Sequence, residues 1–350
     1  MEDIKSNFNN FMKKPDFNKF LKMLKREDLD NPIPFEFLID LKHGQIEAKD
    51  DWISDDDPLA QAKNVIKTFY HLGYDYSFIY PWLFDSIAFP VSNDIDKKKS
   101  IGQAHCGIIK DEKSFEEYKW PEISDLDYSI IDEIAENVPD GMKSIIAGPG
   151  GVLENLIALC GFEDLCFMLF DKPELVKEIT DNIGKRLYQH YERALQSDCI
   201  GAVMVNDDWG FKTSLSISPD DMRKYIIPWH KKFAELARKN GVPAIMHSCG
   251  NLDLVWDDII NEIKFDGKHS YEDNILPVED AYKKYGDKIA ILGGIDMHFM
   301  STAAPEEITK RAEKLMELTN GKGYALGVGN SVTNYIPHEN YMAMLNVIRG

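Results

Sequence analysis

The sequence predicts an α/β protein whose single domain is a (β/α)8 barrel of the TIM type. From about residue 30 onward, short apolar or β-branched runs alternate with longer segments of helical period, which is the pattern of repeated βα units. Each run ends in Gly, Pro or an acidic residue, as expected for parallel strands that are buried on both faces and become polar only where they stop. The eight predicted strands are residues 32–40, 74–82, 144–150, 202–210, 242–250, 265–272, 289–296 and 323–331.

Proline and capping residues mark where several of the intervening helices begin. Asp171 is interpreted as an N-cap before Pro173, and Ser218 repeats this arrangement before Pro219. A third helix is expected to open at Pro305. Apolar residues follow each start at helical spacing, so these faces are predicted to pack against the strands rather than to bind a cofactor.

A helical extension, residues 1–30, precedes the barrel, which spans residues 31–350. The extension contains an amphipathic segment with Phe17, Phe20 and Leu24. We expect this segment and its neighbour Leu21 to cover the floor of the barrel.

An insertion, residues 83–143, separates the second and third predicted strands. It is rich in Asp, Lys and Ser, and its run of Lys97, Lys98 and Lys99 is interpreted as a solvated loop. Because no Pro-, Ser- or Gly-rich linker divides the chain, one domain is the simpler interpretation.

The composition excludes several classes of partner. Lys and Arg total 40 against 59 Asp and Glu, a formal charge of -19 that repels phosphate backbones and anionic lipid headgroups. The excess acid is interpreted as a solvated surface, and nucleic acid is not expected as a partner. Five scattered Cys are typical of reduced thiols in a cytoplasmic protein, and no apolar stretch is long enough to suggest a signal peptide or a membrane span.

The strongest local motif is His247-Ser248-Cys249-Gly250 at the end of the fifth predicted strand. Alternate residues of a strand point the same way, so His247 and Cys249 would present an imidazole and a thiol to the barrel mouth, where the carboxyl ends of the strands converge. This pair could hold zinc, with a third ligand from a neighbouring strand end. Glu272 is the first candidate for that ligand, and Asn330 and His269 are weaker ones. The alternative is a small buried thiol beside a hydrogen-bonded core histidine.

A second polar motif, Asp207-Asp208-Trp209-Gly210, ends the fourth predicted strand. Only one of the two carboxylates can face the mouth, and Asp207 is favoured because it shares parity with Val203 and Val205. Its expected roles are general acid-base catalysis, ligand orientation or support of a metal-bound histidine; the alternative is an aspartate that caps the loop.

Other strand ends complete the expected site. Glu272 and Asn330 are assigned catalytic roles beside Asp207, and Asp208, Trp209, Gly150 and Asp296 are expected to contact the substrate. The sequence has no G-x-G-x-x-G between strand and helix, no P-loop, no G-x-S-x-G elbow and no H-E-x-x-H, so nucleotide binding and serine hydrolase chemistry lack their usual motifs.

Read together, HSCGNL, NDDWG, LGGID and GVGNSVTNYIP resemble the uroporphyrinogen decarboxylase superfamily, from about Pro32 to the end of the chain. The resemblance implies a TIM-type barrel and one of two chemistries. One branch decarboxylates the acetate side chains of uroporphyrinogen without a cofactor. The other contains zinc-dependent methyltransferases, such as the methylcobalamin:coenzyme M methyltransferases, which move a methyl group between a corrinoid and a thiol or another acceptor.

The chain is more similar to the methyltransferase branch. The decarboxylases have an Arg-rich stretch after the first strand, whereas PIPFEFLIDLKHG contains no Arg. The methyltransferases use an H-x-C pair as zinc ligands, which His247 and Cys249 match, but they commonly add a Cys where this chain has Asn330. The resemblance therefore shifts weight onto Glu272 as a ligand.

The resemblance also implies cofactors and partners. Zinc would be the metal, and the corrinoid, methylcobalamin, would arrive as substrate or on a separate corrinoid protein that docks transiently over the mouth. A small molecule would be the other methyl donor or acceptor, and a homodimer is possible in this superfamily. The alternatives left open are a decarboxylase-type lyase and a non-catalytic barrel that binds a small molecule or a partner.

Overall fold

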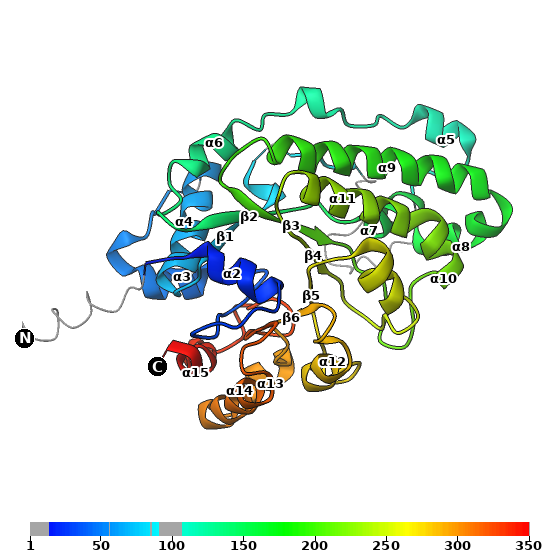
Figure 1. Cartoon of the computed structure of the whole chain (residues 1–350). Helices are drawn as coiled ribbons and strands as arrows, with labels where there is room; N and C mark the ends of the chain where they lie inside the picture. Colours follow the sequence, from blue (N-terminus) through cyan, green and yellow to red (C-terminus); the bar gives the residue numbers. More distant parts are fainter. Residues whose placement is uncertain (1–13, 56, 85, 91–106, 350) are drawn as a thin grey trace, which may run out of the picture.

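The chain folds as a TIM-barrel-like α/β structure in which parallel strands curl around a central core (Figure 1). The computed structural model describes residues 14–55, 57–84, 86–90 and 107–349. Within these residues seven strands pair in sequence order, each parallel to the next. They are β1 (Tyr76–Ile79), β2 (Lys143–Ala147), β3 (Ile200–Asn206), β4 (Ala244–His247), β5 (Gly267–His269), β6 (Ala290–Leu292) and β7 (Tyr324–Ala325). The predicted fold class is confirmed.

The first predicted strand, residues 32–40, joins the sheet through isolated bridges instead of a continuous ladder. Its residues Pro34 and Ile39 pair in parallel with Leu326 and Val332, which follow β7. On its other side the contacts to β1 run through side chains: the Tyr76 hydroxyl bonds to both backbone groups of Glu36, at 2.8 and 3.1 Å. This segment therefore fills the eighth position of the barrel, but it forms isolated bridges and not the regular strand that was predicted over residues 32–40.

Helices cover the outside of the sheet (Figure 1). Those that follow the strands or precede β1 are α3 (Leu41–Ala48), α4 (Pro58–His71), α7 (Val152–Cys160), α8 (Phe162–Asp171), α9 (Pro173–Ala194), α10 (Pro219–Asp221), α11 (Ile227–Lys239), α12 (Val278–Tyr285), α13 (Met297–Thr302), α14 (Pro305–Thr319) and α15 (His338–Arg349). Short turns of 3-10 or π-helix lie at Lys49–Asp51, Met222–Ile226 and Asp258–Ile263.

The predicted helix starts at Pro173, Pro219 and Pro305 are confirmed. Ser218 caps α10, with its side chain accepting from the backbone N–H of Asp221. Asp171 is not the N-cap of α9, because it forms the last residue of α8 and Lys172 occupies the cap position.

The N-terminal helix α2 (Phe17–Leu24) packs against the barrel as predicted. Asp16 caps it, and its buried residues are Phe17, Phe20, Met23 and Leu24. The Phe20 ring lies 5.0 Å from Tyr76 at the start of β1. Leu21 is only partly buried. The helix thus closes the end of the barrel opposite the carboxyl ends of the strands.

A 3-10 turn at Pro81–Leu83 leads into the insertion, which carries α5 (Glu112–Glu117), α6 (Ile130–Ala135) and a second 3-10 turn at Ile123–Asp125. It runs along the outer side of α9 (Figure 1), where Arg186 donates to Pro121 O at 2.6 Å and pairs with Glu122 at 2.6 Å. The Lys97–Lys99 run lies outside the described residues.

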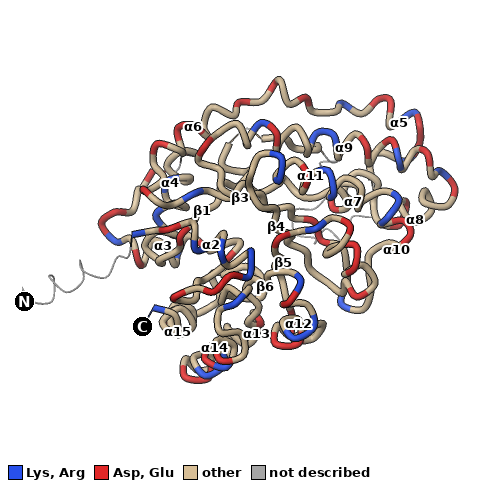
Figure 2. The backbone as a smooth tube through the Cα atoms, viewed as in Figure 1, with Lys and Arg blue, Asp and Glu red and all other residues tan. Residues whose placement is uncertain are grey.

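The charged residues are distributed over the outer helices, with acidic and basic groups interspersed (Figure 2). In the part of the chain that the structure describes, every helix is too short or too polar to span a bilayer.

Glu36 lies in residues 32–40, the segment that joins the sheet through isolated bridges. Its buried carboxyl group should make the stability of the protein depend on pH. It is fully buried, accepts from Val328 N at 2.9 Å, and burial raises its pKa well above the usual value. In the unfolded chain the Glu36 carboxyl group loses its proton at the ordinary carboxyl pKa, whereas in the folded chain it stays protonated. The free energy of unfolding therefore falls as pH rises above about 4.5 towards the folded pKa. The loss is about 1.4 kcal/mol per pH unit in that window.

Glu36→Gln should remove this dependence, so the variant gains stability relative to the wild type as pH rises above about 4.5 towards the folded pKa of Glu36. Urea unfolding at several pH values measures the difference, with Glu178→Gln, an exposed position on α9, as the control. Parallel pH profiles for wild type and Glu36→Gln would contradict the assignment.

Candidate metal centre

Asp208, His247 and Cys249 meet at the carboxyl ends of β3 and β4. One ligand atom from each lies within 4.8 Å of the other two. His247 Nε2 is 3.8 Å from Cys249 Sγ and 3.9 Å from Asp208 Oδ1. The imidazole and thiol therefore converge as the H-x-C spacing predicts, and the carboxylate beside them belongs to Asp208.

His247 is held with one ring nitrogen turned towards the group. Its Nδ1 lies 2.8 Å from Nδ1 of His269, its partner in the β4–β5 pairing, and the Phe37 ring packs 4.7 Å away. Burial lowers the pKa of His247 to about 4, so the imidazole is neutral near pH 7. If Nδ1 of His247 carries the proton and donates it to His269, the Nε2 lone pair is free for a metal. His269, a weaker ligand candidate, thus lies behind His247.

Cys249 is surrounded by polar contacts. Asn330 Nδ2 donates to Sγ at 3.1 Å, Ser270 Oγ lies 3.4 Å from Sγ, and the Cys249 backbone N–H donates to Asp208 Oδ1 at 2.8 Å. Burial raises the pKa of the thiol to about 12, so without a metal Cys249 is protonated at neutral pH. Asn330, from the loop after β7, thus touches the predicted thiol ligand directly.

Asp207 does not face the mouth, and the prediction that it does is wrong. Its carboxylate is fully buried and accepts four hydrogen bonds, from Leu153 N, Glu154 N, Trp209 Nε1 and His230 Nε2, at 2.8 to 3.1 Å. The parity argument failed because β3 ends at Asn206, so side-chain alternation does not continue to residues 207 and 208. Asp208, with 44% of its side chain exposed, has the place expected for Asp207.

Trp209 is fully buried, which contradicts its predicted place on a substrate-binding surface. Its indole N–H donates to Asp207, and its ring packs edge-on against His230 at 4.8 Å. The residue is part of the packing that holds Asp207.

Glu272 lies outside the three-residue group. It is half-buried after β5, and burial followed by the charge of Asp296 raises its pKa. Asp296 caps α13, accepting from His298 N at 2.8 Å and Phe299 N at 3.2 Å. Gly150 has a φ of +74° in the turn between β2 and α7. These contacts give Asp296 and Gly150 structural roles at the rim.

Two glycines bring the loops of the group together. A methyl group at Gly250, which has a φ of +88°, would lie 2.1 Å from the carbonyl oxygen of Gly210. Asn251 N donates to Phe211 O at 2.8 Å beside this crossing. The close approach holds the loops that carry Asp208 and Cys249 against each other.

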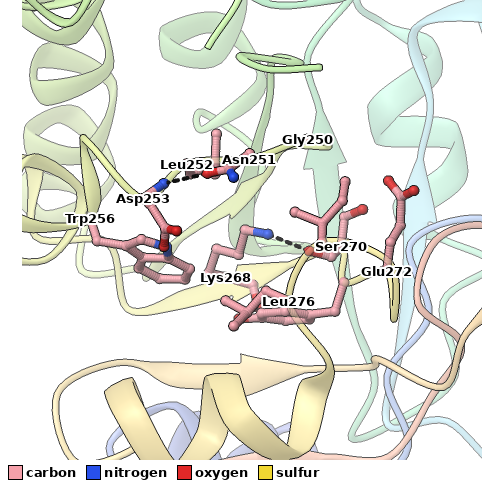
Figure 3. Close-up of a pocket in the computed structure, with 11 residues that line it drawn as sticks. Gly250, Asn251, Leu252, Asp253, Trp256, Lys268, Ser270, Glu272 and Leu276 are labelled. Carbon is pink, nitrogen blue, oxygen red and sulfur yellow. Dashed lines mark hydrogen bonds between the residues drawn. The ribbon is translucent and has the colours of Figure 1, made fainter. Parts of the chain in front are cut away.

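A small cavity of about 20 Å³ adjoins the group, between the ends of β4 and β5 (Figure 3). Its lining includes Gly250, Lys268, Ser270, Tyr271 and Glu272. Lys268 and Ser270 were not identified from the sequence. The only signal for Lys268 was a charged residue within a predicted buried strand, which could have marked it as an inward-facing group.

The donor set fits a zinc ion. Zinc binds imidazole nitrogen, thiolate sulfur and carboxylate oxygen, and catalytic zinc commonly has three protein ligands and one open position. His247, Cys249 and Asp208 offer one donor of each kind. The other ring nitrogen of His247 has a hydrogen-bond partner, as in most metal-binding histidines, although here the partner is a second histidine.

Comparison with known proteins places the chain in a family. The family model described as uroporphyrinogen decarboxylase (URO-D) matches residues 107–350. Uroporphyrinogen decarboxylase from Rickettsia conorii is 22% identical over 270 residues, 73% of each chain. The enzyme of that name from Pseudoalteromonas atlantica is 25% identical over 186 residues, 52% of this chain and 50% of that protein.

A solved structure described as a methyltransferase from Methanosarcina mazei has the same fold, with a TM-score of 0.70 over 96% of this chain and 98% of that chain at 14% identity. The barrel, its mouth and the match over most of the sequence lead to one conclusion: the chain belongs to the uroporphyrinogen decarboxylase family of enzymes.

Proposed function

We propose that this protein is a zinc-dependent methyltransferase that moves a methyl group between a corrinoid and a thiol or another small acceptor. The observation that carries the proposal is the convergence of Asp208, His247 and Cys249 at the barrel mouth, with His247 braced by His269. The similarity in fold to a methyltransferase from Methanosarcina mazei supports it. A separate corrinoid protein would bring the methyl carrier to the mouth.

Asp208, His247 and Cys249 would each contribute a different donor to a zinc ion. Zinc held there would supply Lewis acidity, which favours the thiolate form of a substrate thiol. His247 provides a neutral nitrogen, and Asp208 and Cys249 provide two negative charges that match those of a divalent ion. The Asn330 amide donates to Cys249 Sγ and so restrains the sulfur's position and basicity.

The decarboxylase alternative is supported by the names of the curated relatives. Against it, residues 32–44 contain no Arg, and Glu36 adds a buried carboxyl to this segment. A ligand with many carboxylates would find little positive charge there.

Two assays with the purified protein distinguish these functions. The proposal predicts stoichiometric zinc after purification without chelator, and transfer of the methyl group of methylcobalamin to 2-mercaptoethanol. Absence of zinc from the wild type would overturn the metal-dependent mechanism. Conversion of uroporphyrinogen to coproporphyrinogen would favour the lyase.

Asp208→Asn and Glu272→Gln separate the two candidates for the carboxylate ligand. Asn can still accept from Cys249 N but provides no charge, so we expect Asp208→Asn to weaken zinc binding at least about 10-fold. Glu272→Gln should change it little, because Glu272 lies outside the group. Competition with a chromophoric chelator measures both affinities, and the opposite ranking would assign the ligand to Glu272.

A further inference from the structure

Lys268 is a buried cation beside the candidate metal centre. It lies on β5 with 3% of its surface exposed. Its ammonium donates to the carbonyl oxygen of Ser270 (Figure 3). The same ammonium lies 4.3 Å from the centre of the Tyr271 ring. Burial of a charged lysine is unfavourable in free energy unless nearby groups compensate its charge. The groups around Lys268 therefore indicate its role.

Ser270 connects this ammonium to the thiol. Its carbonyl accepts from Lys268, and its hydroxyl lies 3.4 Å from Cys249 Sγ. Ser270 has a φ of +89°, a conformation that residues other than glycine rarely adopt. This backbone turn directs the carbonyl towards Lys268 while the side chain stays on Cys249. Such strain persists only where the surrounding contacts impose it, and it is concentrated at functional sites.

The charges acting on Lys268 come from the centre and from the neighbouring Glu272. The carboxylates of Asp208 and Glu272, and Cys249 in its thiolate form, favour the protonated form of Lys268. Although burial lowers the pKa of Lys268 to about 8, the ammonium is the main form at pH 7. Glu272 lies outside the Asp208–His247–Cys249 group, which leaves Asp208 and Cys249 as the negative partners that belong to the centre.

Charge balance then suggests a role. A divalent ion with the Asp208 carboxylate and the Cys249 thiolate is neutral, so a substrate that binds there as an anion leaves one uncompensated negative charge. An unbalanced charge in a partly buried site is unfavourable. The Lys268 ammonium bonds to the Ser270 carbonyl, and the Ser270 hydroxyl lies beside Cys249 Sγ, so this cation would supply the missing positive charge.

We propose that Lys268 is a positioning residue that compensates the charge of an anionic substrate group, a thiolate, bound at the Asp208–His247–Cys249 centre. The inference rests on the proposed function and adds the charge state of the substrate that the site accepts. Lys268 then stabilises the bound anionic substrate and does not contribute to metal affinity.

The test uses full-length protein loaded with Co²⁺, whose visible spectrum reports each added ligand. At pH 7, 2-mercaptoethanol is the anionic probe, since it binds as thiolate, and imidazole is the neutral probe. Lys268→Met should weaken binding of the thiol about 10-fold, a change of about 1.4 kcal/mol, and leave imidazole binding unchanged. Lys268→Arg should recover part of the loss. Lys284→Met, an exposed lysine paired with Asp253 on the cavity rim, is the matched control and should behave as wild type.

The outcomes separate the two proposals. Unchanged thiol affinity in Lys268→Met, with Co²⁺ bound, overturns the role of Lys268 and leaves the proposed function intact. Equal losses for thiol and imidazole, or loss of Co²⁺ itself, would show a structural role and also overturn it. A wild type that binds neither Zn²⁺ nor Co²⁺ overturns both proposals.

Discussion

Cys249→Ala should abolish stoichiometric zinc binding and lower methyl transfer to 2-mercaptoethanol by at least about 1,000-fold, which corresponds to about 4 kcal/mol of transition-state stabilisation. The thiol is the softest donor of the group, and its removal leaves an imidazole and a carboxylate, too few ligands to retain zinc against a chelator. His247→Ala should have the same effect. Metal content by atomic emission and the loss of methylcobalamin absorbance measure the two effects.

Cys166→Ala is the matched control, because it removes an exposed thiol from α8. It should keep both zinc and activity. Full activity in Cys249→Ala would show that the thiol is one more buried cysteine and not a ligand.

Asp207→Ala should lower the free energy of unfolding by about 3–5 kcal/mol. The carboxylate accepts from two backbone N–H groups at the start of α7, from the Trp209 indole and from His230. Alanine leaves all four donors buried without an acceptor, and each loses the hydrogen bond that offsets its removal from water. Urea unfolding at pH 7 measures the change.

Asp207→Asn provides a second variant that should fold. It keeps one carbonyl oxygen as acceptor but turns an amide towards the remaining donors, so we expect a smaller loss than for alanine. If the free energy of unfolding falls by less than about 1 kcal/mol in Asp207→Ala, water replaces the carboxylate and the buried hydrogen-bond network contributes little to stability.

Most of the fold could be predicted from local patterns. Apolar runs with polar ends located all seven strands of the sheet, because strands covered by helices on both faces must be apolar throughout. The irregular pairing of residues 32–40 could not be predicted, since it depends on the Tyr76 hydroxyl of β1, which takes over both backbone hydrogen bonds of Glu36.

The candidate site was predicted in part. The spacing of His247 and Cys249 was enough to bring them together, because His247 ends β4 and Cys249 follows it by two residues. The carboxylate partner depended on where β3 ends, and the sequence around Asp207 and Asp208 does not mark that point. Glu272 was expected beside them from strand order and from the family resemblance, but the left-handed turn at Ser270 precedes it, and serine is not a residue that signals such a turn.

The close approach of Gly210 and Gly250 holds the loops that carry Asp208 and Cys249 in place before an ion binds. With no side chain to separate them, the two loops are already in van der Waals contact, so little chain entropy is lost when a guest ion joins Asp208 to Cys249. The two loops, and not the ion, then fix the distance between the Asp208 carboxylate oxygen and Cys249 Sγ. An ion of unsuitable radius would therefore bind with metal–ligand bond lengths far from its preferred values.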